Sequence, residues 1–161
     1  MTNISLIDVE ERPTVALRRQ VRTDALADFF AGVFDEVSAQ LERAGIQIGG
    51  APFARYRGVP GDVADIEAGF PLTAPWPGGA DGELLAGTLP TARAVEAVHQ
   101  GSYDTLRETY QALEAFVAEH NLHLQEEWWE IYDSGPSSDQ DPGTWRTRIV
   151  WPIEYPQVTS D

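Results

Sequence analysis

The feature that most constrains how this chain of 161 residues folds is an internal repeat. Leu26 recurs as Leu106, 80 residues later, and the run Phe70-Pro71-Leu72 recurs as Trp151-Pro152-Ile153, 81 residues later. Two further matches are Phe30 with Tyr110 and residues 53–56 with 129–132. The nearly constant offset favours duplication of one folding unit over a chance match between short apolar patterns. We therefore interpret the chain as two related halves.

The first half alternates strand and helix patterns. Residues 12–21 are typical of a strand. From Leu26 to Gly45, apolar side chains fall at three- and four-residue steps, which predicts an amphipathic helix. Two shorter β-like runs, 53–57 and 63–71, follow on either side of a turn rich in glycine and proline. The apolar side of the helix requires a sheet to cover it.

The second half repeats this order. A β-like run over residues 88–100 leads to a helix that begins after Gly101-Ser102. Further β-like runs over 126–133 and 144–155 follow, separated by a polar loop with no strand character. Residues 71–83, between the halves, are rich in proline and glycine and are typical of a linker.

These patterns predict an α+β fold in a single domain of two pseudo-symmetric modules. We expect module 1 over about 4–72, the linker over about 71–83 and module 2 over about 84–156. Each module is expected to contain an antiparallel sheet packed by one long helix. The uncovered sheet faces would then be buried against each other or line a ligand cleft between the modules.

Composition argues against several classes of function. The chain has 11 arginines, no lysine and a formal net charge of −15, which opposes nucleic-acid binding through phosphate neutralisation. It has no cysteine, so disulfides and thiolate catalysis are excluded. The acidic charge either keeps the protein in solution or raises the local concentration of organic cations. With no signal-peptide pattern and no stretch of membrane-spanning length, we expect a cytoplasmic protein without a membrane partner.

The segment QEEWWEIY carries the most chemical information. Side chains alternate along a strand, so Trp128, Glu130 and Tyr132 project to one face while Trp129 and Ile131 project to the other. A register slip of one residue would exchange Trp128 with Trp129. An acid on a strand is commonly exposed, but exposure of both Trp128 and Tyr132 would create an unusual apolar patch. We therefore expect Glu130 to lie among aromatic side chains.

A carboxylate surrounded by aromatic rings favours a particular kind of ligand. The loss of hydration raises its pKa unless a cation approaches. Flat, delocalised cations suit such a site because each good contact with a ring face contributes about 0.5–2 kcal/mol. Trp145 heads the next strand, where hairpin pairing would bring it beside Glu130, and Tyr56 corresponds to Tyr132 in the first half. Taken alone, each aromatic residue is more simply explained by core packing.

Three motifs follow one another in a specific order along the chain. They are Ile66–Pro71 (IEAGFP), His99–Tyr103 (HQGSY), and Trp129–Tyr132 (WEIY) followed by an acidic, proline-containing loop and Trp145–Pro152. In this order and spacing, nearly the whole chain resembles the GyrI-like small-molecule-binding domains, also found as effector-binding halves of AraC- and MerR-type drug-responsive regulators. The resemblance implies two pseudo-symmetric ββαββ modules around an aromatic pocket, whose buried glutamate receives lipophilic cations. By position, that glutamate is Glu130, and Trp145 is a pocket wall.

We therefore expect a protein that sequesters or senses bulky lipophilic, cationic aromatic molecules, with Glu130 as counter-ion. Trp76, between two prolines of the linker, is expected either to close over the ligand or to anchor its own loop. The expected ligand-contacting side chains are Glu130, Tyr132, Trp145, Trp128, Tyr56 and Trp76. No helix-turn-helix segment is recognised, so we expect a sensor part without a DNA-reading part.

Two other functions remain open. Some stand-alone members of the resembled family hydrolyse strained, cyclopropane-bearing toxins. Here Glu130 would position or deprotonate a water while Tyr132 donates a hydrogen bond. The same acid in the same surroundings serves a binder or a hydrolase, so the sequence does not decide whether the protein is an enzyme, although binding is our first expectation. The third reading is a protein-interaction role such as gyrase antagonism, in which the acidic surface matters.

Other polar residues have simpler explanations. His120 and His123 lie near the end of the second helix without an evident third ligand, so no metal site and no cofactor is expected. Glu67 is either a second pocket acid or a solvated carboxylate at a strand end. His99 matches a structural position of the resembled family. The signatures of serine hydrolases and nucleotide-binding loops are missing from the sequence.

Overall fold

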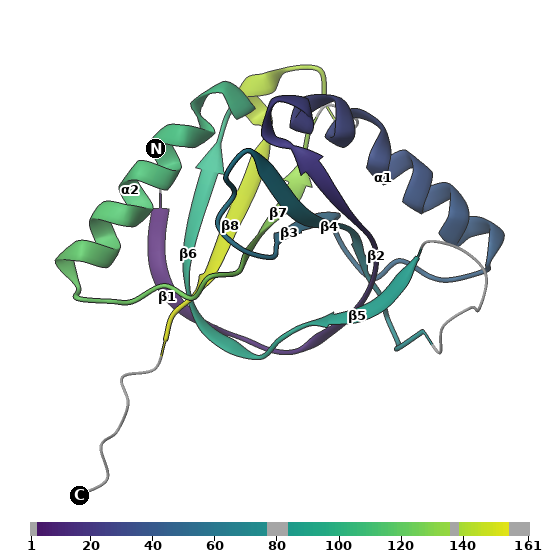
Figure 1. Cartoon of the computed structure of the whole chain (residues 1–161), viewed down its shortest axis with the longest axis horizontal. Coiled ribbons are helices and arrows are strands. Elements are labelled where there is room, and N and C mark those ends of the chain that lie inside the picture. Colours follow the sequence, from purple (N-terminus) through teal and green to yellow (C-terminus); the bar gives the residue numbers. More distant parts are fainter. Residues whose placement is uncertain (1–2, 77–83, 136–138, 155–161) are drawn as a thin grey trace, which may run out of the picture.

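The computed structural model describes residues 3–76, 84–135 and 139–154 (Figure 1). In chain order, the elements are β1 (Asn3–Val9), β2 (Arg12–Arg22), α1 (Leu26–Arg43), β3 (Phe53–Tyr56), β4 (Val63–Pro71), β5 (Leu85–Leu89), β6 (Ala92–Gln100), α2 (Leu106–Glu119), β7 (Trp128–Ser134) and β8 (Arg146–Pro152). Short 3-10 turns, η1 (Thr23–Ala25), η2 (Tyr103–Thr105) and η3 (Pro142–Thr144), precede α1, α2 and β8. In the part of the chain that is described, no helix has the length and apolar character needed to cross a membrane.

Both helices form where the apolar spacing predicts them. α1 buries Val33, Val37 and Leu41 along one side. It ends before Gly45, whose φ of 70° is a left-handed conformation that glycine adopts without steric cost. α2 ends in a similar way before Asn121, with a φ of 54°, a conformation that asparagine tolerates better than most residues.

The eight strands form one antiparallel sheet in the order β1-β6-β8-β7-β3-β4-β2-β5. The halves meet at β3 and β7, where Ala54 lies opposite Glu130 and Tyr56 lies opposite Trp128. The expectation of a separate sheet for each module is therefore wrong. Pairing the two hairpins satisfies backbone groups that would otherwise remain open at two sheet edges.

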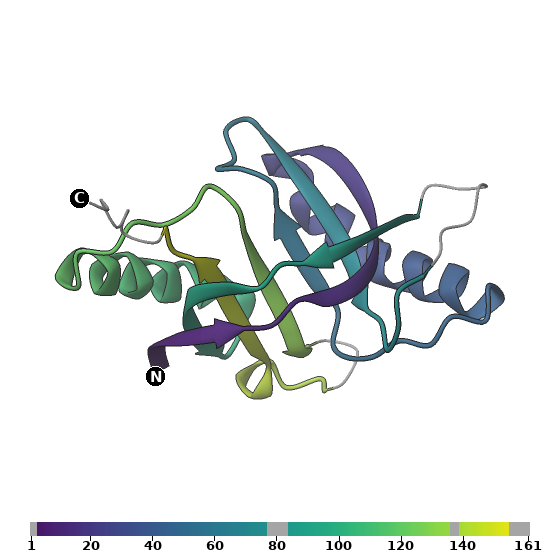
Figure 2. The same cartoon turned by 90° about the horizontal axis from the view of Figure 1, so that it is seen from below.

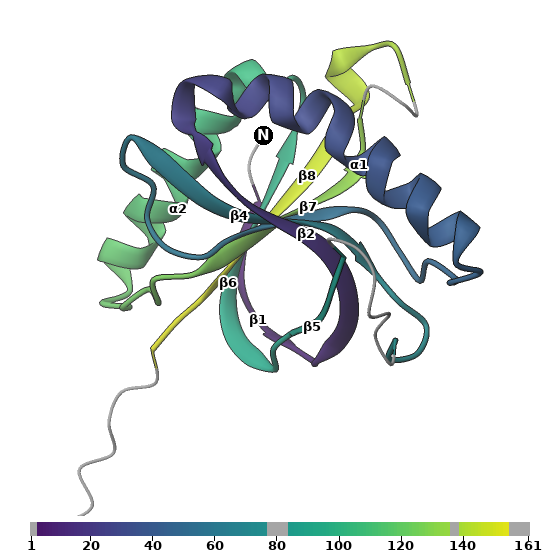
Figure 3. The same ribbon diagram turned by 45° about the vertical axis from the view of Figure 1, so that its right-hand side comes forward.

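The first strand of each half pairs with the other half. β1 pairs with β6 and β5 pairs with β2. One register continues through both pairs, because Val9 lies opposite Ala92 and Arg12 lies opposite Leu89. The segments β1–β2 and β5–β6 therefore run side by side as one long ribbon (Figure 2). Through this ribbon the sheet curls and closes on itself (Figure 3).

The predicted single run over residues 88–100 is two strands in the structure. Pro90 separates them, since proline lacks the N–H that a continuous strand would use. At this break the backbone N–H of Glu11 donates to the hydroxyl oxygen of Thr91 at 3.0 Å. The β1–β2 connection and the β5–β6 connection are thus hydrogen-bonded to each other where they lie side by side.

The closed sheet has two different faces. Both helices lie on one of them, which we call the helix-covered face (Figures 1 and 3). Its side chains form the larger buried cluster together with Val37 of α1 and Leu113 of α2. The opposite, inner face carries a smaller cluster that includes Phe53, Trp129 and Val150. Any functional side chain on a strand therefore belongs to one of two separate environments.

Candidate functional site

Strand β7 distributes the QEEWWEIY side chains between the two faces. Trp128 and Tyr132 belong to the helix-covered cluster, whereas Trp129 and Ile131 belong to the inner cluster. The structure thus has the predicted alternation, with Trp128 and not Trp129 on the side of Glu130. Trp128 and Trp129 are 5% and 3% exposed, so both faces of this strand are covered.

Glu130 is a buried acid, 4% exposed, that accepts hydrogen bonds from two phenols. The hydroxyl of Tyr132, on the same strand, donates to Glu130 Oε1 at 2.6 Å. The hydroxyl of Tyr110, on α2, donates to Glu130 Oε2. Trp128 Nε1 in turn donates to the Tyr110 oxygen at 2.9 Å. The carboxylate therefore lies at the centre of a network that ties α2 to β7.

Tyr110 was not predicted as a site residue. In the sequence it belongs to the apolar stripe of a helix, where an aromatic residue normally packs in the core. The one available signal was its hydroxyl, because a buried tyrosine hydroxyl usually has a hydrogen-bond partner. Glu130 is that partner.

Burial sets the protonation behaviour of the site. Loss of hydration raises the pKa of Glu130, while the hydrogen bonds from Tyr110 and Tyr132 and the charge of His99 act in the opposite direction. Burial also raises the pKa of Tyr110 and of Tyr132 well above the ordinary tyrosine value, with the nearby Glu130 charge adding to the effect. The two phenols therefore remain protonated and act as donors.

Aromatic rings enclose the carboxylate. Tyr56 stacks on Trp128 with ring centroids 4.8 Å apart, and Trp128 stacks on Trp151 with centroids 4.1 Å apart. On the other side, Phe34 of α1 contacts Tyr132 edge to face at 5.6 Å. The predicted residues Trp128, Tyr132 and Tyr56 are thus brought together with Glu130. Trp151 was predicted only as part of the repeat, and it forms the far side of the stack.

Trp145 lies further from Glu130 than the sequence suggested. In the β7–β8 pairing, Ile149 is the residue opposite Glu130. The Trp145 indole contacts Tyr103 at 5.1 Å, and Tyr103 contacts Tyr132 at 6.2 Å. Trp145 precedes β8, so hairpin pairing does not carry it to the acid. Tyr103, 39% exposed, lies between the carboxylate network and the surface.

The remaining candidates have structural contacts. His99 is buried, and its ring nitrogens lie 2.6 Å from the Thr109 hydroxyl and 2.9 Å from the Ser102 carbonyl, so it joins β6 to the start of α2. Trp76 is partly buried against the helix-covered cluster. Glu67 forms an ion pair of 3.2 Å with Arg57, so it is not a second acid beside Glu130.

The described residues contain no cluster of three or more His, Cys, Asp or Glu side chains able to hold a metal ion. His120 Nδ1 lies 2.9 Å from the carbonyl oxygen of Phe116, and the His120 ring stacks on the Phe116 ring at 4.1 Å. This histidine therefore stabilises the end of α2.

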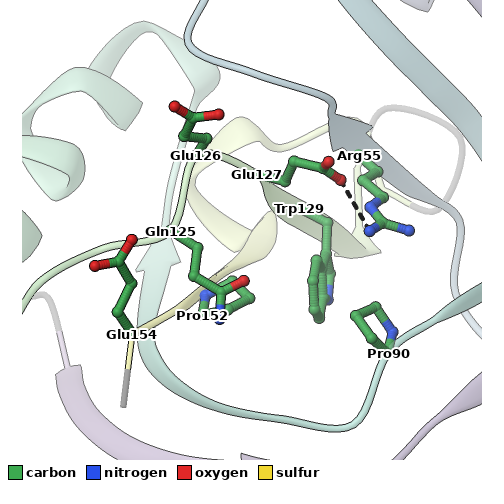
Figure 4. A pocket seen from close by; sticks show the side chains of 8 residues that line it. All are labelled: Arg55, Pro90, Gln125, Glu126, Glu127, Trp129, Pro152 and Glu154. Carbon is green, nitrogen blue, oxygen red and sulfur yellow. Dashed lines mark ion pairs between the residues drawn. The ribbon is translucent and has the colours of Figure 1, made fainter. Parts of the chain in front are cut away.

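Two cavities are present on the inner face, and Glu130 lines neither of them. One, of about 430 Å³, lies beside Trp129, Arg55 and Glu127 (Figure 4). In it, Arg55 Nη2 is 2.9 Å from Glu127 Oε1, and its guanidinium carbon lies 5.9 Å from the centre of the Trp129 ring. The second cavity has a volume of about 710 Å³. Glu130 itself is 4% exposed, so neighbouring side chains cover it in this conformation.

Sequence comparison matches residues 2–154 to the family described as "GyrI-like small molecule binding domain". No curated protein matches the sequence. The structure superposes on the C-terminal domain of EcmrR with a TM-score of 0.82 and 21% identity, covering 97% of this chain and 99% of that domain. In a complex of EcmrR with DNA, the match has a TM-score of 0.80 and 22% identity. It covers 96% of this chain and 58% of the EcmrR chain, so this chain spans little more than half of that protein.

Two more distant structures share the fold. One is SAV2435 bound to tetraphenylphosphonium, with a TM-score of 0.65 and 12% identity, covering 94% of both chains. The other is a hydrolase encoded by lin2189 from Listeria innocua, with a TM-score of 0.58 and 13% identity, covering 94% of this chain and 91% of that one. At these identities the similarity concerns the fold alone.

Proposed function

The chain belongs to the GyrI-like small-molecule-binding domain family, and we propose that it binds a bulky, flat, lipophilic cation next to Glu130. The observation that carries this proposal is a fully enclosed carboxylate that has aromatic neighbours and no arginine partner among the described ion pairs. A buried acid without a counter-ion is costly for folding and attractive to a cation. Tetraphenylphosphonium, bound by a protein of the same fold, is likewise a bulky lipophilic cation with aromatic rings, although its four phenyl groups are arranged tetrahedrally around phosphorus.

Two hydrogen bonds to Glu130 explain how an acid without an arginine partner is tolerated. The phenols of Tyr110 and Tyr132 stabilise the carboxylate without neutralising it. A quaternary cation such as tetraphenylphosphonium has no N–H or O–H to donate, so it would not replace these hydrogen bonds. It instead gains Coulomb attraction at low dielectric and cation–π contact with the surrounding rings.

We place the route of the ligand at the end of the site nearest Tyr103. Tyr103 is the most exposed ring of the network, and its tilted contact with Trp145 is made at the surface end of β8. Movement of these two rings would uncover Tyr132 and then Glu130. In this proposal Trp145 lines the entrance, while Trp128 and Tyr56 form the inner wall. Trp76 supports the wall from its position against the same cluster.

We also interpret the strand order as a record of duplication. If β1–β4 correspond to β5–β8, the order β1-β6-β8-β7-β3-β4-β2-β5 reads the same from either end. The two modules would then have exchanged their first strands, and the pseudo-twofold axis would pass between β3 and β7. Tyr56 and Glu130 lie on these two central strands, which supports a pocket where the modules meet.

Titration with tetraphenylphosphonium, followed by tryptophan fluorescence, tests the proposal. Saturable binding is expected, and Glu130→Gln should weaken it by about 1–3 kcal/mol because the shape remains while the charge is lost. Glu126→Gln is the matched control, since it removes one carboxylate charge from an exposed position nearby. The uncharged triphenylphosphine oxide should bind both variants equally. Equal loss of cation affinity in the two variants would contradict a specific role for Glu130.

One observation favours a second candidate function, hydrolysis of a strained electrophile. The Thr147 hydroxyl lies on the strand position opposite both Tyr132 and His99, is fully buried and has no hydrogen-bond partner among the described residues. A water held there would lie close to an acid whose pKa is raised, as a general base requires. Mass spectrometry of a cyclopropane-bearing toxin after incubation with the protein distinguishes the two functions. Hydrated product with the wild type, together with intact bound compound with Glu130→Gln, would support an enzyme.

A further inference from the structure

The inner face of the sheet contains a groove that the proposed cation site does not use. Its volume of about 710 Å³ lies within the range of about 300–1,000 Å³ that is typical of small-molecule sites. The groove is lined by Trp129 and Ile131, which alternate along β7 with Glu130. Glu130 therefore points away from it, to the helix-covered face. Whatever occupies this groove is separated from the Glu130 site by the sheet.

The floor of the groove is apolar and well ordered by packing. Phe53, Trp129 and Val150 are 1%, 3% and 1% exposed and form its base. Ile7 and Ile131 are partly buried and line its sides. On its far side the Trp129 ring is held by the Arg55 guanidinium, which is fixed by its ion pair with Glu127 (Figure 4). Trp129 is thus packed on its far side by a paired arginine while it lines the groove.

The charged side chains of the groove are already paired or lie at its rim. Arg148 donates to both carboxylate oxygens of Asp133, at 2.7 and 2.9 Å, and its Nη1 lies 3.8 Å from Glu96. Arg12 is exposed, and its Nη2 donates to the carbonyl oxygen of Gly49 at 3.0 Å. The acids adjacent to Arg12 in the sequence, Glu10 and Glu11, are also exposed. Neither a cation nor an anion therefore finds a buried, unpaired counter-charge in this groove.

From this geometry we propose that the inner face carries a second binding site, for an uncharged apolar small molecule. The attraction comes from burial of the ligand's own apolar surface and of the surface that Ile7, Val9 and Ile131 still expose. Arg148 and Glu96 are already in ion pairs, and Arg12, Glu10 and Glu11 lie exposed at the rim, so a charged compound would lose hydration in the groove without gaining a buried partner. The two faces of one sheet would thus bind ligands of different charge, independently of each other.

The test uses N-phenyl-1-naphthylamine, an uncharged compound whose fluorescence increases when it leaves water, with the full chain. We expect a saturable increase. Ala51 lines the groove and is half-buried, so Ala51→Phe should fill part of the space and weaken binding by about tenfold or more. Ala39→Phe, at an exposed position of α1, is the matched control and should bind as the wild type does. Ile131→Gln is a second variant, which removes apolar contact without filling the groove.

The outcomes separate this proposal from the cation site. Glu130→Gln and excess tetraphenylphosphonium should leave the affinity for N-phenyl-1-naphthylamine unchanged. Absence of a saturable signal, or equal binding by the wild type, Ala51→Phe and Ile131→Gln, would overturn the second site. So would displacement by tetraphenylphosphonium together with loss of binding in Glu130→Gln, since the probe would then occupy the Glu130 site. The role of Glu130 is decided separately, by the cation titration alone.

Discussion

At the scale of single residues, the Glu130 carboxylate shows how a buried acid is accommodated without an arginine partner in the described part of the chain. Two phenols of high pKa donate to it, and a third aromatic residue, Trp128, donates to one of those phenols. The hydrogen bonds offset part of the desolvation cost, but the pKa of Glu130 remains raised. Part of the desolvation cost of the Glu130 carboxylate therefore remains, and a cation bound beside it would offset this cost.

This raised pKa predicts a specific dependence of stability on pH. The ordinary value is 4.5 and the folded value is higher, so the folded state keeps a proton that the unfolded chain has lost. The contribution of Glu130 to the free energy of unfolding is thus fully present below pH 4.5 and is lost as pH rises through the folded pKa. Urea denaturation should show the wild type losing stability relative to Glu130→Gln across this window.

Comparison with the variant is needed because other acids of this chain also titrate. Taking the difference in the free energy of unfolding between the wild type and Glu130→Gln removes the effect of these other acids, which both proteins share. A difference that stays constant across the window would show that the pKa of Glu130 is not raised. Affinity for tetraphenylphosphonium should change in the opposite direction, rising with pH as the carboxylate ionises.

At the scale of elements, the close approach of β2 and β4 depends on one glycine. A Cβ at Gly69 would lie 2.0 Å from the carbonyl oxygen of Val15 and 2.6 Å from the Cα of Ala16, and backbone cannot move aside as a side chain can. Gly69→Ala should therefore lower the free energy of unfolding by about 3 kcal/mol or more. Urea denaturation at pH 7 measures this change.

The matched control is Gly32, in the exposed part of α1. A Cβ there meets no atom within 4 Å, so Gly32→Ala should stabilise the protein by about 0.5–1 kcal/mol through helix propensity. Similar effects of the two substitutions would show that the β2–β4 contact is looser than described. The IEAGFP motif that contains Gly69 thus has a backbone reason for its glycine.

Much of this level of structure could be predicted from sequence, and the failures have physical causes. Helix periodicity located α1 and α2, and strand alternation placed Trp128, Glu130 and Tyr132 on one face. The pairings of β1 with β6 and of β5 with β2 could not be predicted, because pairing between distant strands leaves no periodicity in either one. The role of Tyr110 could not be predicted for a related reason, since its partner Glu130 lies on another element. The apolar spacing of a helix is the same whether its tyrosine only packs in the core or also donates a hydrogen bond.

At the scale of the whole molecule, the pairing of β1 with β6 and of β5 with β2 leaves no boundary at which one half could unfold alone. β1 completes the sheet of the second half, β5 that of the first, and β3 pairs with β7 between them. Loss of either half would expose the edges and apolar faces of the other. We therefore expect a single cooperative unfolding transition for the full chain.

The distribution of tryptophan makes this expectation measurable. Four of the five tryptophans, Trp128, Trp129, Trp145 and Trp151, belong to the second half, whereas Gly69 belongs to the first. If the halves unfold together, Gly69→Ala should lower the urea midpoint of tryptophan fluorescence as much as that of far-ultraviolet circular dichroism. If they unfold independently, the fluorescence midpoint would stay where it is in the wild type while the dichroism transition broadens. Coincident shifts of both signals would mean that each face of the sheet depends on the integrity of both halves.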